Sequence, residues 1–244
     1  MQTIIVIPCY NEAERLSIQS FIDFVVSNPS ISFLFVNDGS SDNTFEILES
    51  IVKNNSNLYL LNLEHNSGKA EAVRKGMIFG VEKFNPKMIG FWDADLATPL
   101  NEIINYIKIM DAHDFDVVTG LRLMRLGARV RRSTKRHYLG RVFATVASNI
   151  LRLPVYDTQC GAKLYKATIV PILFEEKFIT RWLFDVEILA RYLCHFGYKE
   201  ATENIYEYPL YQWMDVGQTR LKKSDFFKAP VELLKIKRKY LNKK

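Results

Sequence analysis

The chain has 244 residues, of which 48% are hydrophobic and 25% charged. This length and composition fit one large α/β domain, or at most two small ones, with a core that needs no disulfides. The three cysteines, Cys9, Cys160 and Cys194, are far apart and form no CxxC pair. Their spacing argues against a disulfide framework and against a zinc site, and it favours a reducing cytosol.

The net charge of +6 is unevenly distributed. Two stretches contain basic residues and no acidic ones, residues 121–141 and residues 235–244. Their basic residues are Arg122, Arg125, Arg129, Arg131, Arg132, Lys135, Arg136 and Arg141 in the first, and Lys235, Lys237, Arg238, Lys239, Lys243 and Lys244 in the second. Such clusters favour partners that carry phosphate, namely nucleic acid, anionic lipid or a phosphorylated substrate. A solvated face or a fraying tail is the plainer alternative.

The first eight residues (MQTIIVIP) have no basic n-region, and their apolar run is too short for a signal peptide. No stretch reaches the roughly 18 apolar residues that span a bilayer. We therefore expect a soluble or peripheral protein, not an integral one, and interpret this start as a first buried strand.

Short apolar runs alternate with amphipathic segments along the first half of the chain. In chain order, strands are predicted at residues 3–7, 33–36, 58–63, 88–92 and 117–119, and helices at 12–26, 43–54, 69–82 and 100–110. Asp42 is a candidate N-cap for the second helix. Alternation of this kind predicts an α/β fold, with a mostly parallel central sheet flanked by helices on both faces.

A different pattern follows the fifth predicted strand. The basic stretch leads into a predicted helix over residues 138–153, which carries an apolar face. A helix with such a face and a basic approach can lie on a membrane surface. Packing against the sheet is the alternative for most of that face.

Four polar motifs each follow one of the first four predicted strands. They are residues 8–12 (PCYNE), 37–40 (NDGS), 66–69 (NSGK) and 93–95 (DAD). Because open α/β sheets bind their ligands at the carboxyl ends of the strands, these motifs should meet at one edge. Their convergence is stronger evidence for a site than any single motif.

Asp93 and Asp95 are separated by one small residue at the end of an apolar run. Two such carboxylates can approach one hard cation, Mg²⁺ or Mn²⁺, together with phosphate oxygens and water. Burying both acids without a cation would be costly. A solvated turn with two helix-capping acids is the alternative.

The second and third motifs suit a nucleotide. Asp38 can accept hydrogen bonds from a nucleobase, although Asp-Gly-Ser is also ordinary turn chemistry. Gly68 and Lys69 open a helix, so backbone amides and an ammonium favour an anion there. The sequence has neither GxxxxGK[ST] nor GxGxxG, which argues against an ordinary NTPase and against a dinucleotide oxidoreductase.

The motifs at residues 7–12, 36–42 and 93–95 together resemble glycosyltransferase family 2. Within it the chain is similar to the dolichyl-phosphate β-glucosyltransferase and polyprenyl-phosphate sugar synthase branch. Residues 68–77, 157–164 and 181–187 point to the glucosyl type, and the resemblance runs from residue 3 to about residue 221. It departs from mannosyl relatives at Gly140, where they often have a serine, and at Ala97-Thr98, where they have a glutamine.

The resemblance implies a GT-A fold in a single domain over residues 1–225, followed by a basic C-terminal helix or tail over residues 226–244. It implies inverting transfer of a hexose, of the glucosyl type from UDP-glucose, onto a polyprenyl phosphate at the cytoplasmic membrane face. A nucleotide-sugar donor, a divalent metal (Mg²⁺ or Mn²⁺) and an anionic membrane surface are the partners it implies, and it leaves room for an integral-membrane partner.

The resemblance also assigns roles to residues, carried over by position. Around the nucleoside it places Pro8, Tyr10, Glu12 and Asp38, and on the ribose side and the metal–diphosphate it places Asp93 and Asp95. Gly68, Lys69 and Gln159 belong to the donor motifs, and Thr219 and Arg220 to a loop that closes over the donor. For the acceptor phosphate the candidates are Arg122, Arg132 and Arg136.

Several alternatives stay open. A saccharide hydroxyl as acceptor would need a general base, for which Asp185 or Glu187 is available, whereas a phosphate acceptor is already ionised. Asp185 is equally explained as part of a helix start. A non-catalytic nucleotide-sugar binder would not need intact Asp93 and Asp95. A nucleic-acid binder would need interleaved aromatic residues that the basic stretch lacks, so no nucleic-acid partner is expected.

Overall fold

The computed structural model describes residues 2–216 and 223–242, and within these ranges the description excludes the side chains of residues 135–136 and 223–227. All five predicted strands are present, which confirms the prediction. In the described part of the chain, seven strands form the main sheet: β1 (Thr3–Cys9), β2 (Ile31–Asp38), β3 (Leu58–Leu63), β4 (Met88–Trp92), β5 (Val117–Leu121), β7 (Ala162–Lys166) and β8 (Ile205–Pro209).

The strand order of this sheet is β3-β2-β1-β4-β7-β5-β8. Pairs β1–β2, β2–β3, β1–β4 and β5–β8 are parallel, while β7 runs antiparallel to both of its neighbours. The prediction of a mostly parallel α/β sheet is therefore confirmed. The antiparallel strand was not predicted.

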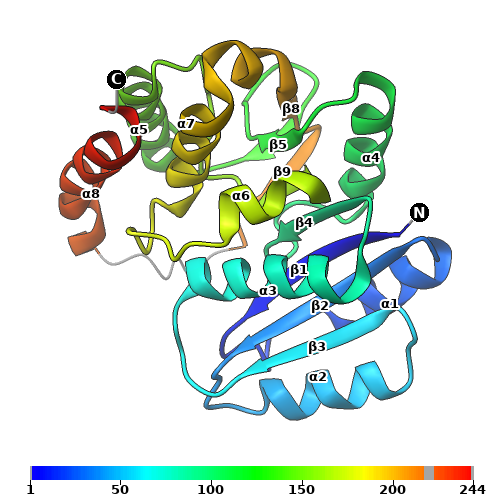
Figure 1. Ribbon diagram of the computed structural model, residues 1–244. Coiled ribbons are helices and arrows are strands. Elements are labelled where there is room, and N and C mark those ends of the chain that lie inside the picture. Colours follow the sequence, from blue (N-terminus) through cyan, green and yellow to red (C-terminus); the bar gives the residue numbers. More distant parts are fainter. Residues whose placement is uncertain (1, 217–222, 243–244) are drawn as a thin grey trace.

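Helices cover both faces of the sheet (Figure 1). Their bounds are α1 (Ile18–Ser27), α2 (Thr44–Lys53), α3 (Lys69–Phe84), α4 (Asn101–His113), α5 (Thr134–Leu151), α6 (Val170–Phe174), α7 (Phe184–Asn204, interrupted at Gly197) and α8 (Lys223–Ile236). None of those described is long and apolar enough to cross a membrane.

Successive residues of a strand point to opposite faces, and β1 shows how this produces two cores. Ile4 and Val6 pack into the core that contains Met77 of α3, together with residues of α6 and α7. Ile5 and Ile7 pack into the other core, which contains residues of α1, α2 and α4. Because β1 is buried on both faces, its sequence is a continuous apolar run.

The helix predicted over residues 12–26 begins six residues later than expected, at Ile18. The Glu12 N–H donates to Thr44 Oγ1 at 2.8 Å, and the Ala13 N–H donates to Asp42 Oδ2 at 3.2 Å. These bonds hold residues 12–16 in a turn against the start of α2. Contacts with a distant segment therefore override the local helical pattern. Asp42 also accepts the Thr44 N–H at 3.0 Å, although Asn43 is the residue that precedes the helix.

The C-terminal segment packs against the rest of the molecule. Leu233 and Ile236 of α8 are buried in the same core as α3 and α7. The chain then continues as a π-helical turn (Lys237–Leu241), from which the Tyr240 hydroxyl donates to Glu187 Oε1 at 2.9 Å. The domain boundary at residue 225 stays a prediction.

Candidate functional site

Asp38 ends β2 and links two of the four strand-end motifs. Its Oδ1 accepts the Ser67 N–H and its Oδ2 accepts the Gly68 N–H, both at 2.8 Å. Burial raises the pKa of Asp38, and the two amide bonds oppose that rise. Because a carboxylate can accept about four hydrogen bonds, this one retains capacity for a nucleobase N–H.

Asp93 and Asp95 follow β4, as predicted, and lie beside the start of α3. Lys69 Nζ forms an ion pair with Asp93 Oδ1 at 2.5 Å, and Asp95 Oδ1 accepts the Ala97 N–H at 3.0 Å. Burial, and then the neighbouring Asp93 charge, raise the pKa of Asp95. A buried acid whose pKa is raised by a second carboxylate is suited to a cation or a cation-bound ligand.

Gly161 fixes the position of the Asp93 carboxylate. The Asp93 N–H donates to the Gly161 carbonyl at 3.0 Å, and a Cβ on Gly161 would clash with the Asp93 carboxylate oxygens. Only glycine fits this close approach, so Gly161 forms the wall behind Asp93. We call residues 157–161 the loop before β7.

The first motif lies at the same edge. Pro8 and Tyr10 are half-buried, whereas Glu12 is buried and its carboxylate is bound by the guanidinium of Arg15, with Nη2 to Oε1 at 2.7 Å. The Arg15 charge also acts on Asp95. The paired acids are thus flanked by the cations Arg15 and Lys69, of which Arg15 was not predicted.

The donor set fits a divalent metal that is shared with a ligand. No group of three or more His, Cys, Asp or Glu side chains suited to a metal occurs in the described residues. The protein therefore offers two carboxylates, Asp93 and Asp95, and further oxygens must come from phosphate and water. Mg²⁺ is commonly bound in this way, by one or two carboxylates plus substrate phosphates.

A groove of about 370 Å³ opens beside Gly68, between α3 and residues 177–181. Its lining includes the cations Lys75, Lys177 and Arg181. The charges of Lys75 and Arg181 also act on the carboxylate of Asp38. The sheet edge beside Asp38 and Gly68 therefore carries more positive charge than the helix start that the sequence identified.

Arg122 lies at the end of β5 and is held firmly by Asp157. Its Nε and Nη2 donate to the two carboxylate oxygens at 2.7 Å each, and its backbone N–H donates to Oδ2 at 3.1 Å. Burial works against both charges, but the ion pair prevails: it raises the pKa of Arg122 and lowers that of Asp157. Arg122 is thus a fixed cation and not a mobile one.

Arg132 lies beside Arg122, and Trp213 is shared between them. The two guanidinium carbons are 5.6 and 5.3 Å from the centre of the Trp213 ring, within cation–π range. Burial, and then the Arg122 charge, lower the pKa of Arg132. Arg132 Nε is buried with no hydrogen-bond partner in the described structure. An anion between the two guanidiniums would offset the repulsion between their charges and would accept a hydrogen bond from Arg132 Nε.

A small second sheet supports this pair of arginines. It joins β6 (Arg129–Arg131) to β9 (Gln212–Met214), which puts Trp213 opposite Val130. Gly140 of α5 packs against Arg132, where a Cβ would lie 3.2 Å from Nη2. The side chain of Arg136 lies outside the described residues, as do Thr219 and Arg220.

Asp185, in the first turn of α7, is buried and forms an ion pair with Lys163 of β7. Burial raises the pKa of Asp185, while the ammonium groups of Lys163 and Lys69 oppose that rise. Gln159 lies in the loop before β7, and its N–H donates to Asp157 Oδ1 at 3.2 Å.

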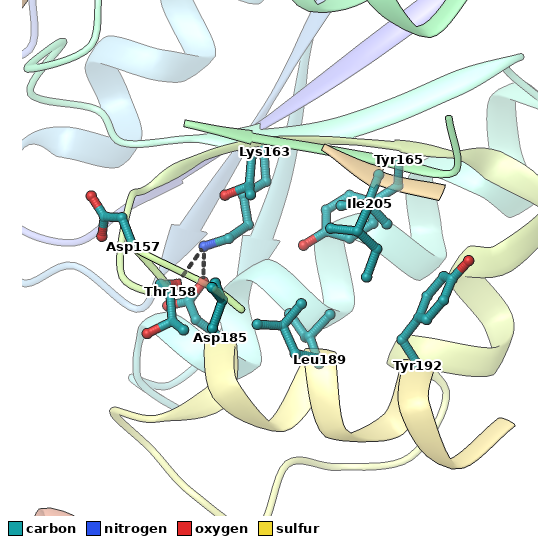
Figure 2. A pocket seen from close by; sticks show the side chains of 12 residues that line it. Asp157, Thr158, Lys163, Tyr165, Asp185, Leu189, Tyr192 and Ile205 are labelled. Atoms are coloured by element: carbon teal, nitrogen blue, oxygen red, sulfur yellow. Dashed lines mark hydrogen bonds and ion pairs between the residues drawn. The ribbon is translucent and has the colours of Figure 1, made fainter. Parts of the chain in front are cut away.

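Figure 2 shows side chains that line a small cavity at this ion pair, with Lys163, Thr158 and Asp185 gathered at one end and Tyr192 at the other. Its volume holds about one water molecule. This cavity is therefore too small for an organic ligand, and the open sheet edge where the motifs lie is the candidate site.

A mixed α/β sheet with paired carboxylates and flanking cations at its strand ends is suited to bind a phosphorylated ligand at that edge. The model of "Glycosyl transferase family 2" matches residues 4–174. The chain belongs to glycosyl transferase family 2 and is a glycosyltransferase, as the motifs predicted.

Among similar proteins is a dolichyl-phosphate beta-glucosyltransferase of Trichomonas vaginalis, 29% identical over 96% of this chain and 70% of its own length. The enzyme of that name from Dictyostelium discoideum is 30% identical over 76% of this chain, and that from Saccharomyces cerevisiae 29% over 76%. The match covers only 60% of the length of each of these two relatives.

Solved structures share the fold. Glucosyl-3-phosphoglycerate synthase from Mycobacterium tuberculosis, crystallised with Mn²⁺, UDP-glucose and phosphoglyceric acid, has a TM-score of 0.69 at 15% identity, covering 97% of this chain and 80% of its own. TarS of S. aureus with UDP-GlcNAc has a TM-score of 0.59 at 17% identity, covering 97% and 66%. The GT-A fold is therefore confirmed.

Besides Arg15, three further residues of the site escaped the sequence analysis. They are Trp213, Lys163 and Glu207. Glu207 of β8 accepts the Tyr156 N–H at 2.8 Å and the Asp157 N–H at 2.7 Å, and so supports the residue that holds Arg122. No local pattern marks these residues, because their partners lie far away in the sequence.

Proposed function

We propose that this chain transfers a glucosyl residue from UDP-glucose to a polyprenyl phosphate at the cytoplasmic face of a membrane. The names of the similar dolichyl-phosphate beta-glucosyltransferases support the acceptor class. Complexes of the related fold with UDP and UDP-glucose support the donor.

One observation carries the proposal: the loop before β7 touches two sites that suit phosphates. At one end Gly161 packs against Asp93, and at the other Asp157 holds Arg122. Four residues span at most about 14 Å, so the carboxylate site and the arginine pair are close neighbours. The Met214 N–H also donates to the Ala97 carbonyl at 3.1 Å, which joins the arginine region to the loop after Asp95.

On the donor side, Asp93 and Asp95 would hold a divalent metal, Mg²⁺ or Mn²⁺, against the diphosphate. Such an ion stabilises the negative charge that builds on the leaving diphosphate. Mn²⁺ in the related complexes supports its use. Lys69, at the start of α3, adds a cation and the helix N-terminus on the same side.

On the acceptor side, Arg122 and Arg132 would bind the lipid phosphate between two guanidinium groups. Because a phosphate is ionised at neutral pH, the site has only to orient it and exclude water. The alternative acceptor, a saccharide hydroxyl, needs a base within hydrogen-bond reach. Asp185 is poorly suited to this, since it is buried and its charge is paired with Lys163.

Two helices offer a surface for membrane contact. On α5 the side chains of Tyr138, Leu139 and Val142 are more than half exposed, and on α8 so are Val231 and Leu234. The helices lie on the same side of the molecule, where α5 contacts the turn after α8 (Figure 1). The exposed bases of these segments include Arg141, Lys235 and Arg238. Apolar residues surrounded by bases suit an anionic lipid surface.

The test is incubation with a panel of radiolabelled UDP- and GDP-sugars, polyprenyl phosphate in liposomes, and Mn²⁺ or Mg²⁺. We expect label in the lipid fraction with UDP-glucose and metal only. Asp95→Ala serves as the inactive control. Label on a soluble saccharide would favour the alternative acceptor, and donor consumption that does not depend on lipid would contradict the proposal.

A further inference from the structure

The Lys163 side chain of β7 is buried, and its ammonium group makes three contacts. Nζ donates to the Thr158 carbonyl at 3.0 Å, to the Cys160 carbonyl at 2.7 Å and to Asp185 Oδ1. An ammonium has three donors, so all of them are used inside the protein. Figure 2 shows Nζ directed between Thr158 and Asp185.

Two of these contacts fix the loop before β7 from within. Backbone carbonyls of a loop are otherwise satisfied by water or by a ladder of strand bonds. Here one side chain binds the carbonyls of Thr158 and Cys160, which lie just inside the two ends of the loop. Their positions relative to each other are therefore set by Lys163.

This loop positions both halves of the site. Asp157, next to Thr158, orients Arg122 through two side-chain bonds of 2.7 Å. Gly161, next to Cys160, contacts the Asp93 carboxylate and accepts the Asp93 N–H at 3.0 Å. A shift of the loop would therefore move two side chains together, Asp93 on the donor side and Arg122 on the acceptor side.

Asp185 supplies the counter-charge that lets the Lys163 ammonium remain buried. A buried cation without a partner is strongly unfavourable. Asp185 is itself buried, and its Oδ1 accepts the Lys163 bond, so its charge is already used in an ion pair. Its place at the start of α7 also joins that helix to the loop.

We propose that Lys163 is a positioning residue that holds residues 157–161 between the donor and acceptor sites, and that Asp185 is its counter-ion and not a general base. The proposal rests on the function proposed above, since it concerns the same two sites. It assigns no chemical step to either residue.

The first test separates a counter-ion from a base. In Asp185→Asn the amide oxygen can still accept a bond from Lys163, so kcat should fall by less than roughly tenfold and the pH–rate profile should keep its shape. A loss of roughly a hundredfold or more in kcat, with both KM values unchanged and the acidic limb of the profile removed, would identify a base and overturn the proposal.

The second test removes the Lys163 ammonium group, which binds the loop carbonyls. Lys163→Met should raise the KM for UDP-glucose and for polyprenyl phosphate together, by roughly tenfold each, because both sites shift with the loop. Lys166→Met on the same strand is the matched control: Lys166 pairs with Asp114 and Asp116 instead, so both KM values should stay within about twofold. Unchanged KM values in Lys163→Met would overturn the proposal.

Because Lys163→Met leaves the Asp185 charge unpaired, Lys163→Met combined with Asp185→Leu is the second variant. It leaves no lone buried charge, so its fold should survive. Its loop carbonyls still lack their donor, and both KM values should remain raised. Recovery of both KM values to those of the unaltered protein would show that the pair contributes to folding alone.

Cysteine alkylation reports the loop without any assay of transfer. Cys160 is fully buried in the loop, Cys9 is buried in β1, and Cys194 is exposed. With iodoacetamide, the Lys163 variants should gain reactivity at Cys160 while Cys9 stays protected and Cys194 reacts as before. Joint reactivity of Cys9 and Cys160 means global unfolding and contradicts a positioning role. Because this readout needs neither substrate, it separates failure of this proposal from failure of the proposed function.

Discussion

The proposed donor and acceptor regions of this molecule are built in different ways. The donor region uses strand ends: Asp38 is fixed by backbone amides, and Asp93 and Asp95 directly follow a buried strand. The acceptor region uses side chains from distant segments, with Arg122 held by Asp157 and Arg132 placed against Trp213. The donor geometry therefore follows from the sheet, whereas the acceptor geometry depends on ion pairs and on the loop before β7.

The comparison predicts the largest effect at the donor carboxylates. Asp95→Ala should lower kcat/KM for glucosyl transfer by roughly a thousandfold, because it removes charge that faces the metal–diphosphate. The control is Asp111→Ala, which removes an exposed carboxylate paired with Lys87 and should change kcat/KM by less than about twofold. Unaltered turnover in Asp95→Ala would mean that this edge is not the donor site.

The second prediction concerns the stability of the acceptor region. Asp157→Asn leaves the mostly buried Arg122 unpaired and should cost about 3 kcal/mol of unfolding free energy at pH 7. The folded-state pKa of Asp157 is lowered, so its stabilisation is present above the unfolded pKa of about 4 and lost as pH falls through the folded pKa.

Urea unfolding of the unaltered protein and of Asp157→Asn at pH 7 and near pH 3 measures this dependence. The difference in unfolding free energy between the two proteins should be large at pH 7 and smaller near pH 3. Asp114→Asn is the control, since the pKa of Asp114 is also lowered, by Lys166, but the carboxylate is exposed. If the difference in unfolding free energy does not depend on pH, the ion pair between Asp157 and Arg122 is not its source.

A third prediction separates the two regions functionally. Arg132→Ala combined with Arg136→Ala should raise the KM for polyprenyl phosphate by roughly tenfold or more while sparing donor hydrolysis without lipid. Arg125→Ala, in the same basic stretch but exposed, is the matched control. If the double variant loses donor hydrolysis as strongly as it loses polyprenyl-phosphate binding, the two regions form a single site.

The smallest effect is expected at the membrane surface. Leu139→Glu combined with Val142→Glu should weaken binding to anionic vesicles by roughly fivefold, through lost apolar contact. Val26→Glu changes an equally exposed apolar residue on α1 and should leave vesicle sedimentation unchanged. Equal binding by all three proteins would exclude this face of α5 from membrane contact.

The difference between the regions also explains how much the sequence could predict. Strands β1 to β4 are long apolar runs with polar residues immediately after them, so both the sheet and Asp93 and Asp95 could be identified. Strands β6 and β9 have three residues each and pair across about 80 residues of chain, which no local periodicity reveals.

The partners of individual side chains were harder to predict. Asp185 was a candidate base, with part of a helix start as the alternative, yet its environment is set by Lys163, 22 residues earlier. The helix over residues 12–26 was placed too early because Asp42 and Thr44 bind residues 12–13. In each case a contact between distant segments outweighs the local pattern.

The central claim, that donor and acceptor sites are adjacent but separate, is tested most directly by equilibrium binding of UDP with Mn²⁺. It is measured for the unaltered protein, for Asp95→Ala and for the Arg132→Ala, Arg136→Ala variant. The account predicts that Asp95→Ala loses UDP binding and that the double arginine variant binds UDP as the unaltered protein does. Loss of UDP binding in both variants, or in neither, would contradict it.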